Sequence, residues 1–409
     1  MIRPFRGLRP VAGRAAEVAA PPYDVLSSDE ARARAAGKPW SFLHISKPDI
    51  DLPAGSDPYA PIVYATAARN LRDMIAQQVL LRDARPSYYV YRLNMGAHTQ
   101  TGLVCTASVA AYDVNRIRKH EFTRPDKEDD RVRQIEALNA QTGPVLMAYP
   151  SAPQVDAILV DATNTPPDAD VLADDGIRHS IWVLRDAVQS VRMSAAFDAM
   201  HALYIADGHH RSAAASRVAA ARNQAGATGV ASHDFFLAVV FPHHQMRILD
   251  YNRVVKDVAG MSVREFLARV SQRFTVRESA SAVKPRQPGE FGLFVEGQWH
   301  SLTIRPERVP AADPVARLDV SLLTDHLLAP VLGISDLRRD KRIDFVGGIR
   351  GLDELEQRVR SGAMAAAFSL YPTRMEDLMA VADAGAVMPP KSTWFEPKLA
   401  DGLVSHVLD

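Results

Sequence analysis

Short apolar runs and helical patterns alternate along this chain. Continuous apolar residues at 202–206 and 235–241 predict two buried strands lying beside each other, because strands that are covered on both faces lose the apolar–polar alternation. Strand-like stretches at 87–93 and 101–109, joined by a connection that contains a glycine, predict a β-hairpin. A second hairpin is predicted over 291–304. Several short strands are therefore expected in different parts of the chain.

Helical patterns separate these strands. One helix is expected after the charged segment 119–131, ending before Gly143 and Pro144. The other predicted helices cover residues 62–78, 212–221, 318–328 and 375–384, and a further strand is predicted at 363–369. Because strands and helices alternate without a strict β-α-β order, the fold class is predicted to be mixed α/β (α+β).

Composition divides the chain into three segments. At 409 residues it is too long for one ordinary core. An N-terminal α+β domain is expected at 1–115, a central core at 116–280, and a C-terminal α/β region at 281–409. The first boundary lies where the charge density rises near Lys119, and the second lies where prolines and a glycine interrupt the pattern at 281–290.

The charge balance narrows the range of partners. The 48 basic and 48 acidic residues cancel, so there is no bulk basic signature and no nucleic-acid partner is predicted. No apolar run of about 18 residues occurs, so neither a membrane-spanning helix nor a membrane partner is expected.

Cysteine content and the N-terminal sequence bear on the cellular location. The single cysteine, Cys105, excludes an intramolecular disulfide, and the N-terminus has no secretory signal. We therefore expect a cytoplasmic protein.

Polar residues follow the apolar run 202–206 directly and precede an alanine-rich helix. They are Asp207, Gly208, His209, His210 and Arg211. The N-terminus of a helix favours anions, arginine offers a planar fork to phosphate oxygens, and glycine permits close backbone approach. The segment therefore predicts a phosphate-binding turn, although its spacing matches neither the Walker nor the dinucleotide-binding motif. A surface turn with incidental histidines is the alternative.

Two distant segments offer complementary chemistry. Glu121 stands before an acidic helix and could accept a proton from a substrate hydroxyl. Lys391, Ser392 and Thr393 lie in a proline-containing loop and could contact a phosphoryl group. The simpler interpretations are a first helical turn whose acidic residues complement the helix dipole, and an ordinary loop.

Histidines allow a metal-binding alternative. His209 and His210 could join His243 and His244 in a zinc site and support a metal-dependent hydrolase. Adjacent histidines point in opposite directions on extended chain, which argues against this set. The sequence leaves the alternative open.

Six motifs together resemble those of the DUF1015 family, over essentially the full length. They are P-P-Y-D-V (21–25), K-H-E-F-T-R-P-D-K-E-D-D-R (119–131), D-G-H-H-R (207–211), Y-N-R-V-V-K-D (251–257), F-V-G-G-I-R-G (345–351) and M-P-P-K-S-T-W-F-E-P-K-L (388–399). The order H-E, D-G-H-H-R, P-K-S-T is also similar, more distantly, to that of the free L-serine kinases of the ParB/sulfiredoxin-like fold. This chain has Trp394 where those kinases place an arginine.

The more distant resemblance implies roles for the motif residues. Glu121 would be the general base, and Asp207 would assist at the hydroxyl or through Mg²⁺. Gly208, His209, His210 and Arg211 would hold the nucleotide phosphates, while Lys391, Ser392 and Thr393 would lie at the acceptor side. A ParB/sulfiredoxin-like nucleotide-binding core is implied for the central segment.

We therefore expect a small-molecule kinase that uses ATP or ADP with Mg²⁺ and converts a hydroxyl acceptor, best represented by free L-serine, to its phosphate ester, O-phospho-L-serine. The alternative is a ParB-like nucleotide-binding switch that transfers no phosphoryl group to a small molecule. The kinase hypothesis requires the three segments to converge in space.

Overall fold

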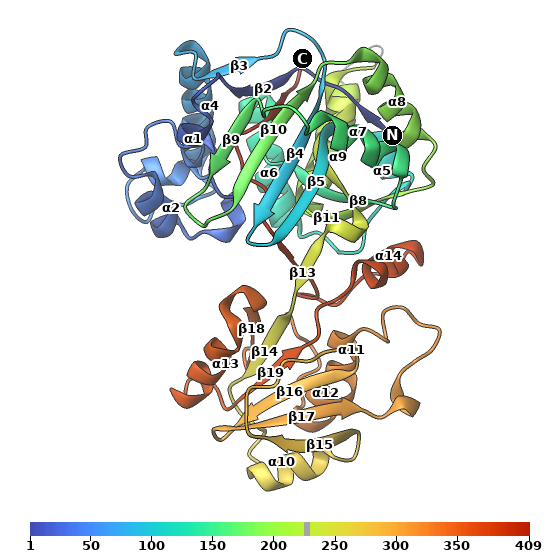
Figure 1. Cartoon of the computed structure of the whole chain (residues 1–409). Helices are drawn as coiled ribbons and strands as arrows, with labels where there is room; N and C mark the ends of the chain where they lie inside the picture. The colour runs from blue at the N-terminus through green and yellow to red at the C-terminus, as the bar shows by residue number, and fades with distance from the viewer. Residues whose placement is uncertain (225–229) are drawn as a thin grey trace. The chain divides into compact units, whose positions relative to one another are not determined.

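The computed structural model describes residues 1–224 and 230–409. Helices and strands alternate through these residues, which confirms the mixed α/β class. The chain divides into two compact units (Figure 1). Unit 1 comprises Met1–Met246 together with Pro397–Asp409, and unit 2 comprises Arg247–Glu396. None of the helices within the described ranges is long and apolar enough to cross a membrane.

Unit 1 contains one large sheet. Of the strands in the described residues, nine belong to it, in the order β6-β11-β8-β12-β5-β4-β10-β9, with β1 also pairing with β5. The bounds are β1 (Ile2–Arg3), β4 (Tyr88–Met95), β5 (His98–Ser108), β6 (Ile117–Arg118), β8 (Val145–Tyr149), β9 (Ala169–Leu172), β10 (Arg178–Leu184), β11 (Leu203–Asp207) and β12 (Phe235–Pro242). Strands β4 and β5 form the first predicted hairpin.

This sheet explains why the observed division differs from the three expected segments. The second half of strand β5 pairs with β12, from Phe235 opposite Ser108 to Val240 opposite Leu103. A boundary near residue 115 would separate these two hydrogen-bonded strands. The segment before the boundary and the segment after it therefore belong to one structural unit.

One strand pairing was predicted wrongly. Strands β11 and β12, the two continuous apolar runs, do not lie beside each other. Strand β8 lies between them, antiparallel to β11 and parallel to β12. All five residues of β8 are buried. This short strand provides hydrogen-bond partners for the backbone groups on the facing edges of both neighbours.

Alternate strand residues form the main core of unit 1. The residues Leu103, Cys105 and Ala107 of β5 point to the same core as alternate residues of β8, β11 and β12. Helices α5 (Val109–Asp113), α7 (Pro153–Ala162) and α8 (Ala187–Asp198) contribute to this core. Helix α7 begins at Pro153, and its first turn is a position where a proline is tolerated.

A smaller sheet holds the C-terminus in unit 1. Strand β21 (Ser405–Val407) lies between β2 (Gly7–Pro10) and β7 (Ala140–Gln141), and β3 (Leu80–Arg82) pairs with β2. The last residues of the chain are therefore part of the same unit as the first.

Helices α6 (Pro125–Leu138) and α9 (His209–Gln224) contain parts of the charged segment and of the histidine turn, and α4 (Pro61–Ala76) supports α6. Helix α6 packs against α4 and against α9. Pro125 occupies the first turn of α6, and Asn139, in the left-handed conformation, ends it. Helix α9 begins three residues earlier than predicted, so the two histidines and Arg211 form its first turn.

Unit 2 contains an antiparallel sheet in the order β15-β17-β16-β19-β14-β18. The bounds are β14 (Tyr251–Val255), β15 (Phe274–Ser279), β16 (Glu290–Val295), β17 (Gln298–Ile304), β18 (Ile343–Gly347) and β19 (Ala366–Leu370), with β13 (Arg247–Leu249) and β20 (Trp394–Glu396) paired separately. Strands β16 and β17 are the second predicted hairpin. The segment 281–290 connects β15 to β16 inside this unit, so it does not separate two units.

Two helices of unit 2 were predicted from the sequence, at 318–328 and 375–384. Helix α10 (Val263–Val270) has a capping box at Ser262, and helices α13 (Gly351–Arg360) and α14 (Met375–Asp383) precede and follow β19. The helix expected at 318–328 is divided into α11 (Asp319–Leu323) and a π-helical turn (Thr324–Leu328), which continues into α12 (Ala329–Leu332).

Candidate functional site

A parallel strand pair brings two of the predicted segments together. Strands β6 and β11 run in the same direction, with Ile117 opposite Leu203 and Arg118 opposite Tyr204. Ile117 and Leu203 are fully buried, which fixes the register of this short pair. Because parallel strands end at the same edge of a sheet, the residues after Arg118 emerge beside the residues that end β11.

Gly208 makes the turn from β11 into α9. Its φ angle is +95°, a region that residues with a side chain rarely adopt. A Cβ atom at this position would lie 3.0 Å from Nε of Arg211 and 3.3 Å from Cα of Val145. The Gly208 N–H donates to Oδ1 of Asp207 over 2.7 Å. A hydrogen bond between two neighbouring residues therefore holds the turn.

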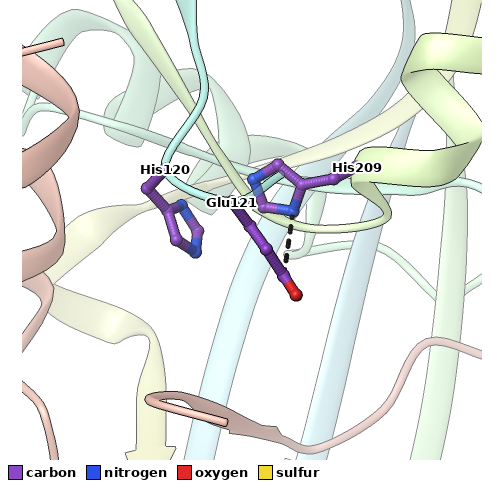
Figure 2. Close-up of side chains that lie close together, drawn as sticks. All are labelled: His120, Glu121 and His209. Carbon is purple, nitrogen blue, oxygen red and sulfur yellow. Dashed lines mark ion pairs between the residues drawn. The ribbon is translucent and has the colours of Figure 1, made fainter. Parts of the chain in front are cut away.

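His120, Glu121 and His209 form a cluster at this turn (Figure 2). Nδ1 of His209 lies 3.6 Å from Oε2 of Glu121. The rings of His120 and His209 meet edge to face, with centroids 4.5 Å apart. Both histidine side chains are buried, whereas the side chain of Glu121 is about half exposed. The cluster therefore presents one carboxylate to the surface and two imidazoles beneath it.

Burial keeps the two imidazoles neutral. It lowers the pKa of His120 to about 4, although a hydrogen bond to the backbone of Ile205 and the charge of Asp207 oppose the shift. Burial, and then the neighbouring His120, lower the pKa of His209 well below its ordinary value. Near neutral pH both rings therefore carry one N–H donor and one nitrogen with a lone pair.

Asp207 is held by two cations. Its Oδ2 lies 3.5 Å from Nζ of Lys398, and its Oδ1 lies 3.9 Å from a guanidinium nitrogen of Arg211. Burial alone would raise the pKa of Asp207, but the charges of Lys398 and Arg211 outweigh it and hold the pKa well below the usual value. Asp207 is thus a fixed negative charge at the end of β11.

Arg211 is a mostly buried member of the predicted phosphate-binding turn. Only 12% of its side chain is exposed, and its Nη1 donates to the carbonyl oxygen of Pro144. Another guanidinium nitrogen lies 3.8 Å from Oδ2 of Asp24. These contacts give Arg211 a positioning role among protein groups, and its contact with a phosphate stays a prediction.

His210 connects the two segments of the site. Its Nε2 accepts a hydrogen bond from the N–H of Arg124 over 3.1 Å. The bond ties the loop that carries Glu121 to the first turn of α9. Since Nε2 is the acceptor, the neutral ring has its proton on Nδ1.

The third predicted segment, Lys391–Thr393, belongs to unit 2. Lys391 has a φ angle of +59°, and its carbonyl oxygen accepts a hydrogen bond from Arg253 over 2.9 Å. The Ser392 hydroxyl donates to the carbonyl oxygen of Pro389 over 2.6 Å. The segment is a tight turn held by its own unit, and its convergence with the other two segments stays a prediction.

The cluster is also the candidate metal site. Among the described residues, His120, Glu121 and His209 offer ligand atoms that all lie within 4.8 Å of one another. The alternative zinc set of His209, His210, His243 and His244 does not form such a group within those residues. Two imidazoles and one carboxylate suit a transition metal better than Mg²⁺, which prefers oxygen ligands, so the cluster does not fit the expected magnesium.

Three residues of this region were not singled out from the sequence. They are His120, Lys398 and Asp24, and each stands inside one of the six motifs. The adjacency of His120 to Glu121 after a short strand was a usable signal. Lys398 and Asp24 had none, because only the return of the C-terminus into unit 1 and the path of the N-terminal loop bring them to the turn.

A family model covers most of the chain. It matches residues 2–321 and is described as a protein of unknown function, DUF1015. The chain belongs to the DUF1015 family. The predicted DUF1015 membership is therefore confirmed, and no curated protein matches this DUF1015 chain.

Solved structures show weak overall similarity to this DUF1015 chain. A conserved hypothetical protein from Pyrococcus furiosus has 15% identity and a TM-score of 0.35, covering 73% of this chain and 93% of its own. A free serine kinase in complex with AMP has 13% identity and a TM-score of 0.36, covering 71% and 86%. C-terminally truncated SbnI from Staphylococcus aureus has 11% identity and a TM-score of 0.36, covering 72% and 84%. Similarity this weak transfers no role to the chain.

Proposed function

We propose that this protein is a phosphotransferase that moves a phosphoryl group from ATP or ADP to the hydroxyl of a small acceptor, with free L-serine as the first acceptor to test. The observation that carries the proposal is the half-exposed carboxylate of Glu121, held 3.6 Å from His209 at the N-terminus of α9. A proton acceptor and an anion-binding helix end thus lie side by side.

The chemistry follows from this arrangement. The acceptor oxygen attacks the terminal phosphorus of the nucleotide, the bond to the bridging oxygen breaks, and ADP or AMP leaves. Glu121 takes the hydroxyl proton. The backbone N–H groups of His209 and His210 and the Nδ1–H of His210 are suited to bind phosphate oxygens. Catalysis of this kind is mainly positioning and charge stabilisation.

Lys398, Asp207 and Arg211 hold the turn before α9 in place. Lys398 keeps Asp207 ionised, and Asp207 in turn accepts the N–H of Gly208, which sets the turn before α9. Arg211 joins the turn to Pro144 and Asp24. The acceptor-side role that the resemblance implies for Lys391–Thr393 stays a prediction, and Trp394 stands where free serine kinases place an arginine.

The test is an assay for a phosphorylated product. Purified protein with Mg²⁺, ATP or ADP, and L-serine is expected to yield O-phosphoserine by mass spectrometry. Glu121→Gln should reduce the rate by about 10²- to 10⁴-fold, the usual contribution of a general base, with nucleotide affinity largely unchanged. Glu17→Gln, a change at an exposed glutamate of helix α1 (Ala15–Val18), is the matched control and should keep full activity.

Two results would count against the proposal. The first is the absence of any phosphorylated product with either nucleotide across a panel of hydroxyl amino acids and other small alcohols. The second is a Glu121→Gln variant as active as the parent protein. Nucleotide binding or nucleotide-dependent dimerisation without a product would instead favour the switch.

A further inference from the structure

The proposed phosphoryl transfer leaves His120 without a role. This side chain is 2% exposed and lies at the junction of β6 and the loop that carries Glu121. It comes from a segment far along the chain from His209, yet the two rings touch (Figure 2). A buried imidazole beside another imidazole and a carboxylate calls for its own explanation.

Both imidazoles have a buried nitrogen without a hydrogen-bond partner. These atoms are Nδ1 of His120 and Nε2 of His209. Buried polar atoms nearly always have a partner, which can be an ordered water or an ion. Nδ1 of His120 is the unpartnered nitrogen that can serve as a ligand in this cluster, because the nitrogen of His209 that faces Glu121 is Nδ1 and not its Nε2. His120 hydrogen-bonds to the backbone of Ile205, and because its Nδ1 is unpartnered, the bonding nitrogen is Nε2. The neutral ring therefore has its proton on Nε2 and a lone pair on Nδ1.

This tautomer is the one that metal sites use. A histidine that binds a metal commonly donates its other N–H to a backbone carbonyl or a carboxylate, which fixes the ring and raises the basicity of the ligating nitrogen. The bond from His120 to Ile205 has this form. The carbonyl belongs to β11, so the same strand that delivers Asp207 also orients His120.

The distances are close to those of a bound ion. Zinc lies about 2.0–2.2 Å from nitrogen and oxygen ligands, so two ligand atoms of a tetrahedral site are about 3.3 Å apart. The distance from His209 Nδ1 to Glu121 Oε2 is already 3.6 Å, and ligand atoms of all three side chains lie within 4.8 Å of one another. Small shifts of the three side chains close the remaining gap, and Glu121, which is half exposed, has the most room to move.

We propose that His120, Glu121 and His209 bind a divalent transition metal ion, with Zn²⁺ as the reference ion, and leave at least one coordination position for water or a ligand. Two histidines and a glutamate form a known ligand set for zinc that keeps an open position. The site goes beyond the proposed phosphoryl transfer, because the ion is expected to bind the chain without nucleotide.

The experiment measures binding directly. The full chain, prepared without a histidine tag and stripped with a chelator, is dialysed against Zn²⁺ in the absence of nucleotide and serine, and the bound metal is determined by elemental analysis and calorimetry. We expect one zinc ion per chain. Co²⁺ in place of Zn²⁺ should give a visible absorption band that Zn²⁺ removes.

Variants assign the ligands. Glu121→Ala and His120→Ala are each expected to weaken Zn²⁺ binding by about tenfold or more, the scale of effect already seen when supporting residues around metals are changed. His244→Ala, at an exposed histidine outside the cluster, should bind as the parent chain does. Because Glu121 is half exposed, its alanine variant is expected to fold, and it carries the test should His120→Ala unfold.

The inference is overturned if the stripped chain takes up no stoichiometric Zn²⁺ or Co²⁺, or if Glu121→Ala binds Zn²⁺ as tightly as the His244→Ala control. A carboxylate that coordinates a metal is a weaker base, so the two roles of Glu121 exclude each other at any one moment. Since the metal experiment contains no nucleotide or acceptor, its failure leaves the phosphoryl-transfer proposal intact, and the reverse also holds.

Discussion

Buried ionisable side chains occur in both units. In unit 1, burial keeps His120 and His209 neutral beside Glu121, which preserves lone pairs at the candidate site. In unit 2, Asp319 at the start of α11 lines a cavity of about 300 Å³. Its Oδ1 accepts the N–H of Gly289 over 2.8 Å, and its Oδ2 is buried without a partner.

Asp319 predicts a pH-dependent stability of unit 2. Burial raises the pKa of Asp319 to about 7, with Asp377 adding to the shift and the Gly289 N–H opposing it. The pKa of an aspartate in an unfolded chain is about 3.9. The folded chain therefore binds the proton of the Asp319 carboxyl group more tightly than the unfolded chain does. The contribution of protonated Asp319 to the stability of unit 2 is therefore complete below about pH 4 and is lost as the pH rises through about 7.

The substitution Asp319→Asn should remove this loss. Between pH 5 and pH 8, hydrogen exchange of the amides of β16 and β19 should accelerate less in the variant than in the parent chain, after correction for the intrinsic rate. Asp353→Asn, at an exposed aspartate of α13, is the control and should follow the parent curve. Parallel curves for all three proteins would show that Asp319 is ionised in the folded chain at both pH values.

The strand–turn–helix unit of β11, Gly208 and α9 combines local and long-range requirements. The local requirement is the positive φ angle at Gly208. The long-range requirement is space beside Val145 of the neighbouring β8, whose Cα would lie 3.3 Å from an added Cβ. This element therefore depends on its neighbour as well as on its own sequence.

Two glycine substitutions separate these requirements. Gly13 has a φ angle of +87° and open space around a Cβ, whereas Gly208 has +95° and close neighbours. Gly13→Ala is expected to lower the free energy of unfolding by about 1–2 kcal/mol through backbone strain alone. Gly208→Ala should lower it by a further ~1–3 kcal/mol, because the neighbours must shift. Urea denaturation of the full chain measures both; equal losses would mean that the crowding is relieved without cost.

At the scale of the whole molecule, the chain leaves unit 1 after Met246 and returns at Pro397. Unit 2 is one continuous stretch with its own sheet and a core that includes Val254, Phe294 and Leu355. Unit 1 is discontinuous, because β21 near the C-terminus pairs with β2 near the N-terminus.

This arrangement predicts which fragments fold. A fragment of residues 247–396 should unfold cooperatively, since its sheet and core are internal to it. A fragment of residues 1–115 should not, because β4 and β5 lose their partners β10 and β12. Thermal unfolding followed by circular dichroism tests both. A cooperative transition of the 1–115 fragment would support the domain boundary expected from composition instead.

Local sequence was enough for several elements and for part of the site. The hairpins, the strand before Asp207 and the helix after Gly208 were predictable, because apolar periodicity and glycine act over a few residues. The order of strands was not, since β8 is short and nothing in its sequence states that it separates β11 from β12. The two-unit division was missed for the same reason: sheet pairing between β5 and β12 joins segments that differ in composition.

The sequence by itself determined the chemical groups at the end of β11, the family to which the chain belongs and the mixed α/β class, because motifs and periodicity are local properties. Only the tertiary structure decided that His120 touches His209, that Lys398 pairs with Asp207 and that Asp24 approaches Arg211. Each of these contacts joins residues that are far apart along the chain. Parallel pairing of β6 with β11, the return of the C-terminus into unit 1 and the path of the N-terminal loop create them. No local sequence pattern predicts any of these three features.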